Sequence, residues 1–119
     1  MSRSPDGPGP GRTVRTYRLQ QATVIELHGE IDVWTAPAVR AHLQHLTGPG
    51  AVLLVDLRPV TFCDCSGLDA LLDAHQQTVL RRGRLQVVCA DVRILNLMRT
   101  TRTRSLFHPA ATLAEALAG

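Results

Sequence analysis

The residues from Ala51 to Leu57, AVLLVDL, form the feature that constrains the fold of this chain most strongly. The run is apolar up to Asp56 and shows no alternation, which is typical of a β-strand covered on both faces. Such a strand lies inside a sheet, with other elements packed against both sides. The run therefore predicts an α/β fold in which residues 51–57 form a central strand.

Strand and helix patterns alternate along the rest of the chain, and HGEID at 28–32 is expected to interrupt them. The expected strands are residues 13–19, 22–27, 51–57, 84–90 and 105–107, and the expected helices begin after Thr35, at Leu68, at Val92 and at Ala111. Alternation of this kind predicts a small α/β domain with a mixed, mostly parallel sheet of about four or five strands and about four helices. Residues 13–119 are expected to form this domain, and residues 1–12, rich in Pro, Gly, Ser and Arg, a flexible tail.

Two of the expected helices carry specific signals. Thr35 followed by Pro37 is typical of an N-cap and a first helical turn. In the next helix, Leu68, Leu71, Leu72, Val79 and Leu80 recur at helical spacing, which predicts one apolar face, and Gly83 is expected to end the helix.

Composition excludes several functional classes. The longest apolar run is far shorter than the roughly 18 residues expected of a membrane span, and the first residues have no apolar signal-peptide region, so we expect a cytoplasmic protein without membrane contact. The net charge is +3, but aromatic residues make up 3% of the chain, so the cluster of Arg81, Arg82 and Arg84 is interpreted as a solvated helix end rather than a nucleic-acid site.

Metal and cofactor sites are not predicted. Cys63, Cys65 and Cys89 lack the two close pairs of ligands of a structural zinc site and are expected to be free thiols. His42 and His45 lie one turn apart on the expected first helix without acidic or thiol companions, which favours surface residues. No glycine-rich nucleotide-binding motif occurs, so we expect no cofactor.

The segment RPVTFCDCSG at 58–67 follows the central strand, where functional groups of open α/β sheets collect. Ser66 has three interpretations. With Asp69 three residues later it matches a capping box, which is common and requires no function. As a hydrolase nucleophile it lacks the G-x-S-x-G flanks and a neighbouring histidine. As a phosphate acceptor it would lie at a helix start, whose N–H groups and dipole favour an anion.

A thiol enzyme based on Cys65 is a further alternative. A helix N-terminus lowers the pKa of a thiol, whereas the adjacent Asp64 opposes a second negative charge. We keep this hypothesis as a minor one, and we expect no catalytic residue.

The stretches VDLRPVTFCDCSGLDALLDAH, VIELHGEIDVWTAPAVRAHL and LFHPAATLAEAL carry one resemblance. Together they resemble the STAS domain of the bacterial anti-sigma factor antagonists. VDLRPVTFCDCSGLDALLDAH is similar to the family pattern V-x-F-x-D-S-S-G-L with its preceding strand and following helix. VIELHGEIDVWTAPAVRAHL resembles the family's G-E-L-D and first helix, and LFHPAATLAEAL resembles its ending. The resemblance covers about residues 13–118 in register.

The resemblance implies a function in transcription regulation by partner switching. Members bind an anti-sigma factor with a GHKL-type serine kinase fold and so release a sigma factor; the kinase phosphorylates the Ser before Gly and a serine phosphatase reverses this. That serine corresponds to Ser66, and the implied partner-binding residues are Asp32, Asp64, Cys65, Ser66, Gly67 and Leu68. The chain departs from the family pattern at Cys65, where Ser is usual, at Asp69, where a small residue is usual, and in MRTTRTRSLF, which lacks a frequent Gly. The alternative within the same fold is a STAS subunit of a transporter or signalling assembly that is not phosphorylated.

Overall fold

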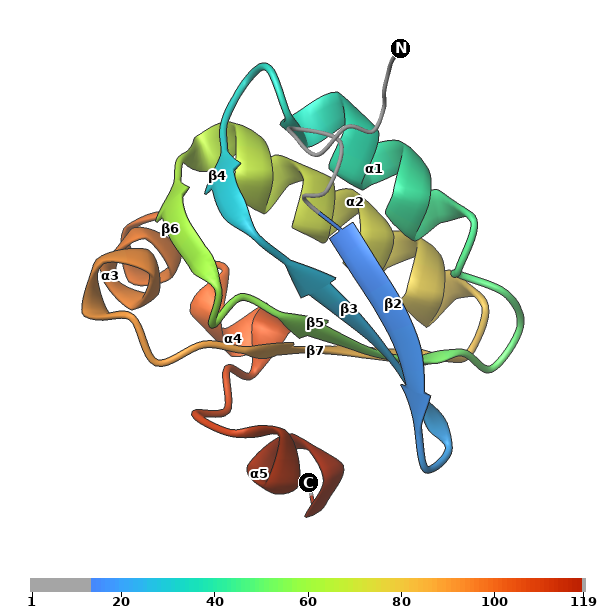
Figure 1. Cartoon of the computed structure of the whole chain (residues 1–119). Helices are drawn as coiled ribbons and strands as arrows, with labels where there is room; N and C mark the ends of the chain where they lie inside the picture. Colours follow the sequence, from blue (N-terminus) through green and yellow to red (C-terminus); the bar gives the residue numbers. More distant parts are fainter. Residues whose placement is uncertain (1–13, 119) are drawn as a thin grey trace, which may run out of the picture.

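A computed structural model describes residues 14–118; the expected tail, residues 1–12, lies outside the described residues (Figure 1). The strands are β2 (Val14–Leu19), β3 (Ala22–Leu27), β4 (Gly29–Ile31), β5 (Val52–Asp56), β6 (Val60–Cys63) and β7 (Arg84–Val88). The helices are α1 (Ala36–Gln44), α2 (Cys65–Leu80), α3 (Val92–Thr100), α4 (Arg104–Phe107) and α5 (Leu113–Ala118).

The main sheet has four strands in the order β2-β3-β5-β7. β2 and β3 form an antiparallel hairpin, and β5 runs parallel to both β3 and β7. Leu53, Leu54 and Val55 in β5 are each at most 1% exposed. The prediction of a mixed, mostly parallel sheet with residues 51–57 at its centre is confirmed.

A second sheet consists of β4 and β6, which pair in parallel. Residues 28–32 were expected to interrupt the strands, but residues 29–31 of this segment form β4. The strand β6, within the segment 58–67 that follows the central strand, was not predicted. The two strands follow β3 and β5 along the chain. Pro59, which has no N–H to donate, lies in the turn between β5 and β6, and its carbonyl accepts a 3.3 Å hydrogen bond from Gly29 N.

Helices cover both faces of the main sheet, as Figure 1 shows for α1 and α2 on one side and α5 on the other. The larger core cluster joins the side of β3, β5 and β7 that carries Ile25, Leu53 and Val55 to buried residues of α1, α2, α3 and α4. The smaller cluster places Ala116 of α5 against the opposite side, next to Leu54. Burial of β5 on both faces explains its uninterrupted apolar sequence.

The segment 105–107 was expected to be a strand, but it lies within the short helix α4. Phe107 from this helix is fully buried in the larger core cluster. A run of three apolar residues is too short to show whether its hydrophobic period is that of a helix or of a strand. The helix is compatible with burial of the Phe107 ring in the core.

The apolar face of α2 also differs from the expected one. Leu68 and Leu71 are buried as predicted, but Val79 is 54% exposed and Leu80 is 76% exposed. The buried stripe continues instead through small or polar residues and reaches Thr78, whose hydroxyl donates a 2.6 Å hydrogen bond to the carbonyl of Ala74. The end of the helix near Gly83 was predicted correctly, because α2 ends at Leu80 and Gly83 N donates to the Thr78 carbonyl.

Candidate functional site

Helix α2 begins directly after β6, and Asp64 is its N-cap. Asp64 Oδ1 accepts a 2.9 Å hydrogen bond from Ser66 N. Of the three interpretations of Ser66, the capping box with Asp69 does not hold, because Asp64 caps the helix and the helix starts before Ser66. Ser66 lies inside the first turn, where its side chain is not needed to satisfy a backbone N–H group.

Gly67 allows the start of α2 to lie close to the small sheet. A Cβ atom at this position would be 2.7 Å from Cys63 Sγ and 2.8 Å from Ile31 Cγ2. Asp64 N also donates a 3.2 Å hydrogen bond to the Ile31 carbonyl, which connects the N-cap to β4. Gly67 and Leu68 are both buried, so any contribution that they make to a partner interface acts through the position of the helix.

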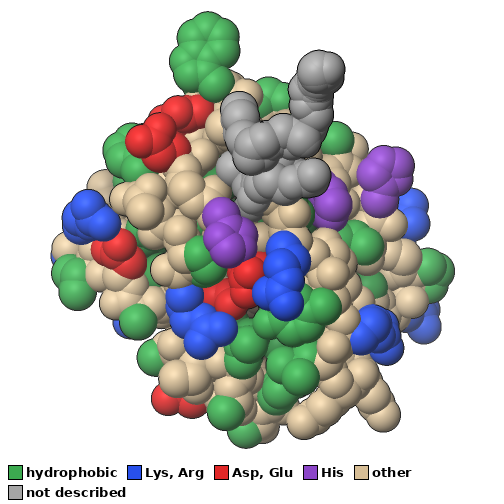
Figure 2. Space-filling view, in the orientation of Figure 1, with side chains coloured by type: hydrophobic (Ala, Val, Ile, Leu, Met, Phe, Trp, Pro, Cys, Tyr) green, Lys and Arg blue, Asp and Glu red, His purple; other side chains and the backbone are tan. Residues whose placement is uncertain are grey.

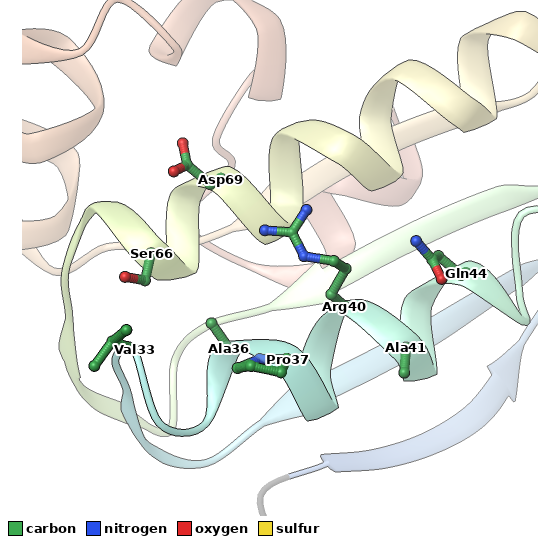
Figure 3. A pocket seen from close by; sticks show the side chains of 8 residues that line it. All are labelled: Val33, Ala36, Pro37, Arg40, Ala41, Gln44, Ser66 and Asp69. Carbon is green, nitrogen blue, oxygen red and sulfur yellow. The ribbon is translucent and has the colours of Figure 1, made fainter.

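The Ser66 side chain is half-buried and lines a groove between the length of α1 and the start of α2. The groove has a volume of about 310 Å³ and is open to solvent. Figure 3 shows Ser66 and Asp69 projecting from α2, and Val33 and Arg40 on the α1 side. Among the residues that the structure describes, Ser66 Oγ makes no side-chain hydrogen bond, so the hydroxyl is available for other chemistry.

The charges around the groove have both signs. Asp69 is exposed and lies three residues after Ser66, on the same side of the helix. Arg40 reaches from α1 and forms an ion pair with Asp73 of α2. Asp64 carries a further carboxylate at the start of the helix, where the helix dipole stabilises a negative charge.

Asp32 organises the loop between β4 and α1. Its Oδ1 accepts hydrogen bonds from Trp34 N at 2.9 Å and from Thr35 N at 3.1 Å. Thr35 is the N-cap of α1 as predicted, but its hydroxyl donates to the Glu30 carbonyl at 2.9 Å instead of capping the helix. The structure thus gives Asp32 a local structural role on the loop that borders the Ser66 groove.

The three cysteines are free and differ in their surroundings. Cys65 is exposed beside Ser66, whereas Cys63 is half-buried and Cys89 is buried. Burial raises the pKa of the Cys63 thiol to about 12, and the negative charge of Asp64 adds to this shift. Burial also raises the pKa of Cys89. Cys63 and Cys89 are therefore protonated at neutral pH and are poor nucleophiles.

Within residues 14–118, no group of three or more His, Cys, Asp or Glu side chains is arranged to hold a metal ion. None of the helices in this part of the chain is long and apolar enough to cross a membrane.

Sequence reasoning missed the α1 side of the groove, which is formed by Val33, Ala36, Pro37, Arg40, Ala41 and Gln44. A weak signal was present, because Ala36, Arg40 and Gln44 recur every four residues and share one face of α1. That pattern does not reveal which element the face meets. The pairing of α1 with α2 is a tertiary contact between segments far apart in the chain.

A family model, related sequences and solved structures all indicate the same family for this chain. The family model of the STAS domain matches residues 13–116. The chain is 28% identical over 87 residues to a Bacillus subtilis (strain 168) protein named anti-sigma-B factor antagonist, with 73% of this chain and 80% of that protein aligned.

Solved structures share the fold over most of the chain. The crystal structure of an anti-sigma factor antagonist from Mycobacterium paratuberculosis matches with a TM-score of 0.80 and 26% identity, covering 89% of this chain and 91% of that chain. The Bacillus cell fate determinant SpoIIAA in its phosphorylated form matches with a TM-score of 0.68 and 19% identity, covering 88% and 96%. From the family match over residues 13–116 and the arrangement of β5, β6 and α2, the chain belongs to the STAS domain family.

Proposed function

We propose that this STAS domain is an anti-sigma factor antagonist that binds an anti-sigma factor of the GHKL-type serine kinase fold, and that phosphorylation of Ser66 switches the binding off. It would act as a regulatory binding protein in the cytoplasm, without a catalytic residue or cofactor of its own, and a serine phosphatase would restore the active form. The observation that carries the proposal is the Ser66 hydroxyl, which has no hydrogen-bond partner among residues 14–118 and lines an open groove at the start of α2.

Access to Ser66 supports its role as the phosphate acceptor. A kinase must bring the γ-phosphate of ATP in line with the serine oxygen, so the oxygen has to be reachable from solvent. Ser66 lines the groove, and Asp64 performs the capping that would otherwise occupy a serine at a helix start. Transfer of a phosphate therefore breaks no hydrogen bond of the Ser66 hydroxyl within the described residues.

The added phosphate is compatible with the folded helix. A phosphate in the first turn lies near the positive end of the helix dipole, which favours an anion. Arg40, which pairs with Asp73, lies on the opposite wall of the same groove. The phosphate therefore alters the surface presented to the partner and leaves the domain folded.

The effect on binding follows from charge. Phosphorylation adds about −1.5 to −2 charges at neutral pH, beside the carboxylates of Asp64 and Asp69. If docking brings one partner carboxylate within about 5 Å of the phosphate, the repulsion at an effective dielectric constant of about 20 is about 3 kcal/mol for each unit of charge on the phosphate. That energy corresponds to a loss of affinity of more than about a hundredfold.

The test is phosphate transfer to a single site. The full chain is incubated with ATP and the purified GHKL-type kinase encoded nearest to its gene, and phosphorylated residues are mapped by mass spectrometry. The expected product carries one phosphate on Ser66. The matched control is Ser105→Ala, because Ser105 is an exposed serine of α4 outside the groove. Ser105→Ala should be phosphorylated as the wild type is, and Ser66→Ala should not.

Two outcomes would contradict the proposal. Phosphate on Ser105, with Ser66 unmodified, would show that the phosphate acceptor lies outside the groove. Tight binding of the kinase without any transfer to Ser66 would support the alternative of a STAS subunit that is not switched by phosphorylation.

A further inference from the structure

Trp34 is the most exposed large hydrophobic side chain among the described residues, at 87% of its surface. It is also the only tryptophan of the chain. The preceding residue, Val33, is 62% exposed, and Phe62 on β6 is 49% exposed. Single exposed apolar residues are ordinary, but these three belong to the two neighbouring segments that flank the start of α2.

The loop that carries Trp34 is held by its own hydrogen bonds. Asp32 Oδ1 accepts from Trp34 N at 2.9 Å, and Thr35 Oγ accepts from Asp32 N at 2.9 Å and donates to the Glu30 carbonyl at 2.9 Å. The indole is therefore presented by an ordered backbone and does not cover the core. With the backbone fixed, only the few rotatable bonds of the Trp34 side chain remain to be ordered on binding, and tryptophan is frequent among the residues that dominate interface energies.

Trp34 lies next to the groove that contains Ser66. Val33, its chain neighbour, lines that groove, as Figure 3 shows. A protein that fills the groove over Ser66 contacts Val33, and Trp34 is the next residue along the chain. The proposed phosphorylation site and the exposed aromatic side chain therefore belong to one surface.

The charge of this surface identifies the chemistry of its partner. Glu30 beside the loop and Asp69 in the groove are both exposed. Arg40, the cation that lines the groove, is instead paired with Asp73. Over the β4–α1 loop, Figure 2 shows hydrophobic atoms projecting from the surface with acidic side chains beside them. Although the whole chain has a net charge of +3, this end presents an apolar anchor with acidic neighbours. The complementary surface is an apolar pocket with basic side chains at its rim.

We propose that Trp34 is the anchor residue of the interface with the anti-sigma factor, and that its indole inserts into an apolar pocket of that protein rimmed by Arg or Lys. This inference rests on the proposed function and adds the residue that supplies most of the binding energy. Trp34 would supply affinity, whereas Ser66 would control it.

The experiment compares Trp34→Ala with Leu80→Ala in titrations of the purified neighbouring kinase. Leu80 is the matched control because it is 76% exposed and lies at the opposite end of α2. Trp34→Ala should weaken binding at least thirtyfold, and Trp34→Phe should recover part of the loss. Leu80→Ala should bind within about twofold of the wild type. Far-UV circular dichroism should give the same melting temperature for Trp34→Ala and the wild type, because the indole is exposed.

Fluorescence gives a second measurement on the unmodified chain when the kinase's own emission is subtracted or its tryptophans are replaced. The emission of Trp34 should shift to shorter wavelength on binding, because the indole leaves water. Unchanged affinity of Trp34→Ala, or an emission spectrum that stays that of a solvated indole in the complex, would overturn the inference while the proposed function stands. Failure of the wild-type chain to bind the kinase would overturn both.

Discussion

Gly67 offers a direct test of how the start of α2 is positioned. The substitution Gly67→Ala would place a methyl group 2.7 Å from Cys63 Sγ and 2.8 Å from Ile31 Cγ2. Real Cβ atoms essentially never approach another heavy atom to within 3.0 Å, so the helix or the side chains of Cys63 and Ile31 must shift. Ile31 is 2% exposed and packed in the larger core cluster, so it has little room to move.

The expected magnitude is a balance of two terms. Overpacking a core costs about 1–3 kcal/mol, and with two close contacts we expect the upper part of that range. Replacing Gly by Ala in a helix recovers up to about 1 kcal/mol from backbone entropy. Gly67→Ala should therefore lower the free energy of unfolding by about 1–2 kcal/mol. Gly48→Ala is the matched control, because a Cβ atom there would have no neighbour within 4 Å, and this variant should be as stable as the wild type or slightly more so.

Urea unfolding followed by far-UV circular dichroism measures these differences through the midpoint at constant m-value. Adding Cys63→Ala to Gly67→Ala removes one of the two contacts, so the double variant should be less destabilised than the sum of the single variants. The reasoning would be refuted by a Gly67→Ala protein as stable as Gly48→Ala, or by strict additivity in this cycle.

Three further predictions concern the cap, the thiols and the pH dependence. Asp64→Ala should lose about 0.5–2 kcal/mol of stability in urea unfolding, whereas Ser66→Ala should lose little, and the reverse order would restore Ser66 as the cap. Iodoacetamide at neutral pH, followed by peptide mass mapping, should label exposed Cys65 and spare Cys63, whose pKa is raised to about 12; equal labelling would contradict this burial. Burial lowers the pKa of His75 in the folded state, so the neutral side chain favours folding fully at pH values above the unfolded pKa of about 6.5, and this stability is lost as the pH falls towards the folded-state pKa. His75→Gln should therefore reduce the decline of the urea midpoint on the acid side. An unchanged decline would assign it to other groups.

The main sheet and the long helices could be predicted because their signals are local. The apolar run at 51–57 is buried on both faces, and its position in the sheet follows from that alone. Strands β4 and β6 have only 3 and 4 residues, and they are defined by pairing with each other across about 30 positions of sequence. Periodicity carries no information about such a pairing.

The start of α2 illustrates a different limit. Asp64 and Ser66 are both good N-cap residues two positions apart, and the sequence contains the match of Ser66 with Asp69 that favours the second. The choice of Asp64 depends on tertiary contacts, namely the hydrogen bond from Asp64 N to Ile31 and the close packing of Gly67. The resemblance singled out Ser66 as a phosphate acceptor, which stays a prediction, and the groove that Ser66 lines together with α1 required the structure.

The central claim is that a phosphate on Ser66 controls recognition of the anti-sigma factor. The most direct measurement is a calorimetric titration of the purified kinase, loaded with a non-hydrolysable ATP analogue, with the wild-type chain, Ser66→Ala, Ser66→Asp and the chain phosphorylated on Ser66. We expect Ser66→Ala to bind as the unphosphorylated wild type does, Ser66→Asp to bind much more weakly, and the phosphorylated chain to bind at least about a hundredfold more weakly. Equal affinity of the phosphorylated and unphosphorylated chains would contradict the account.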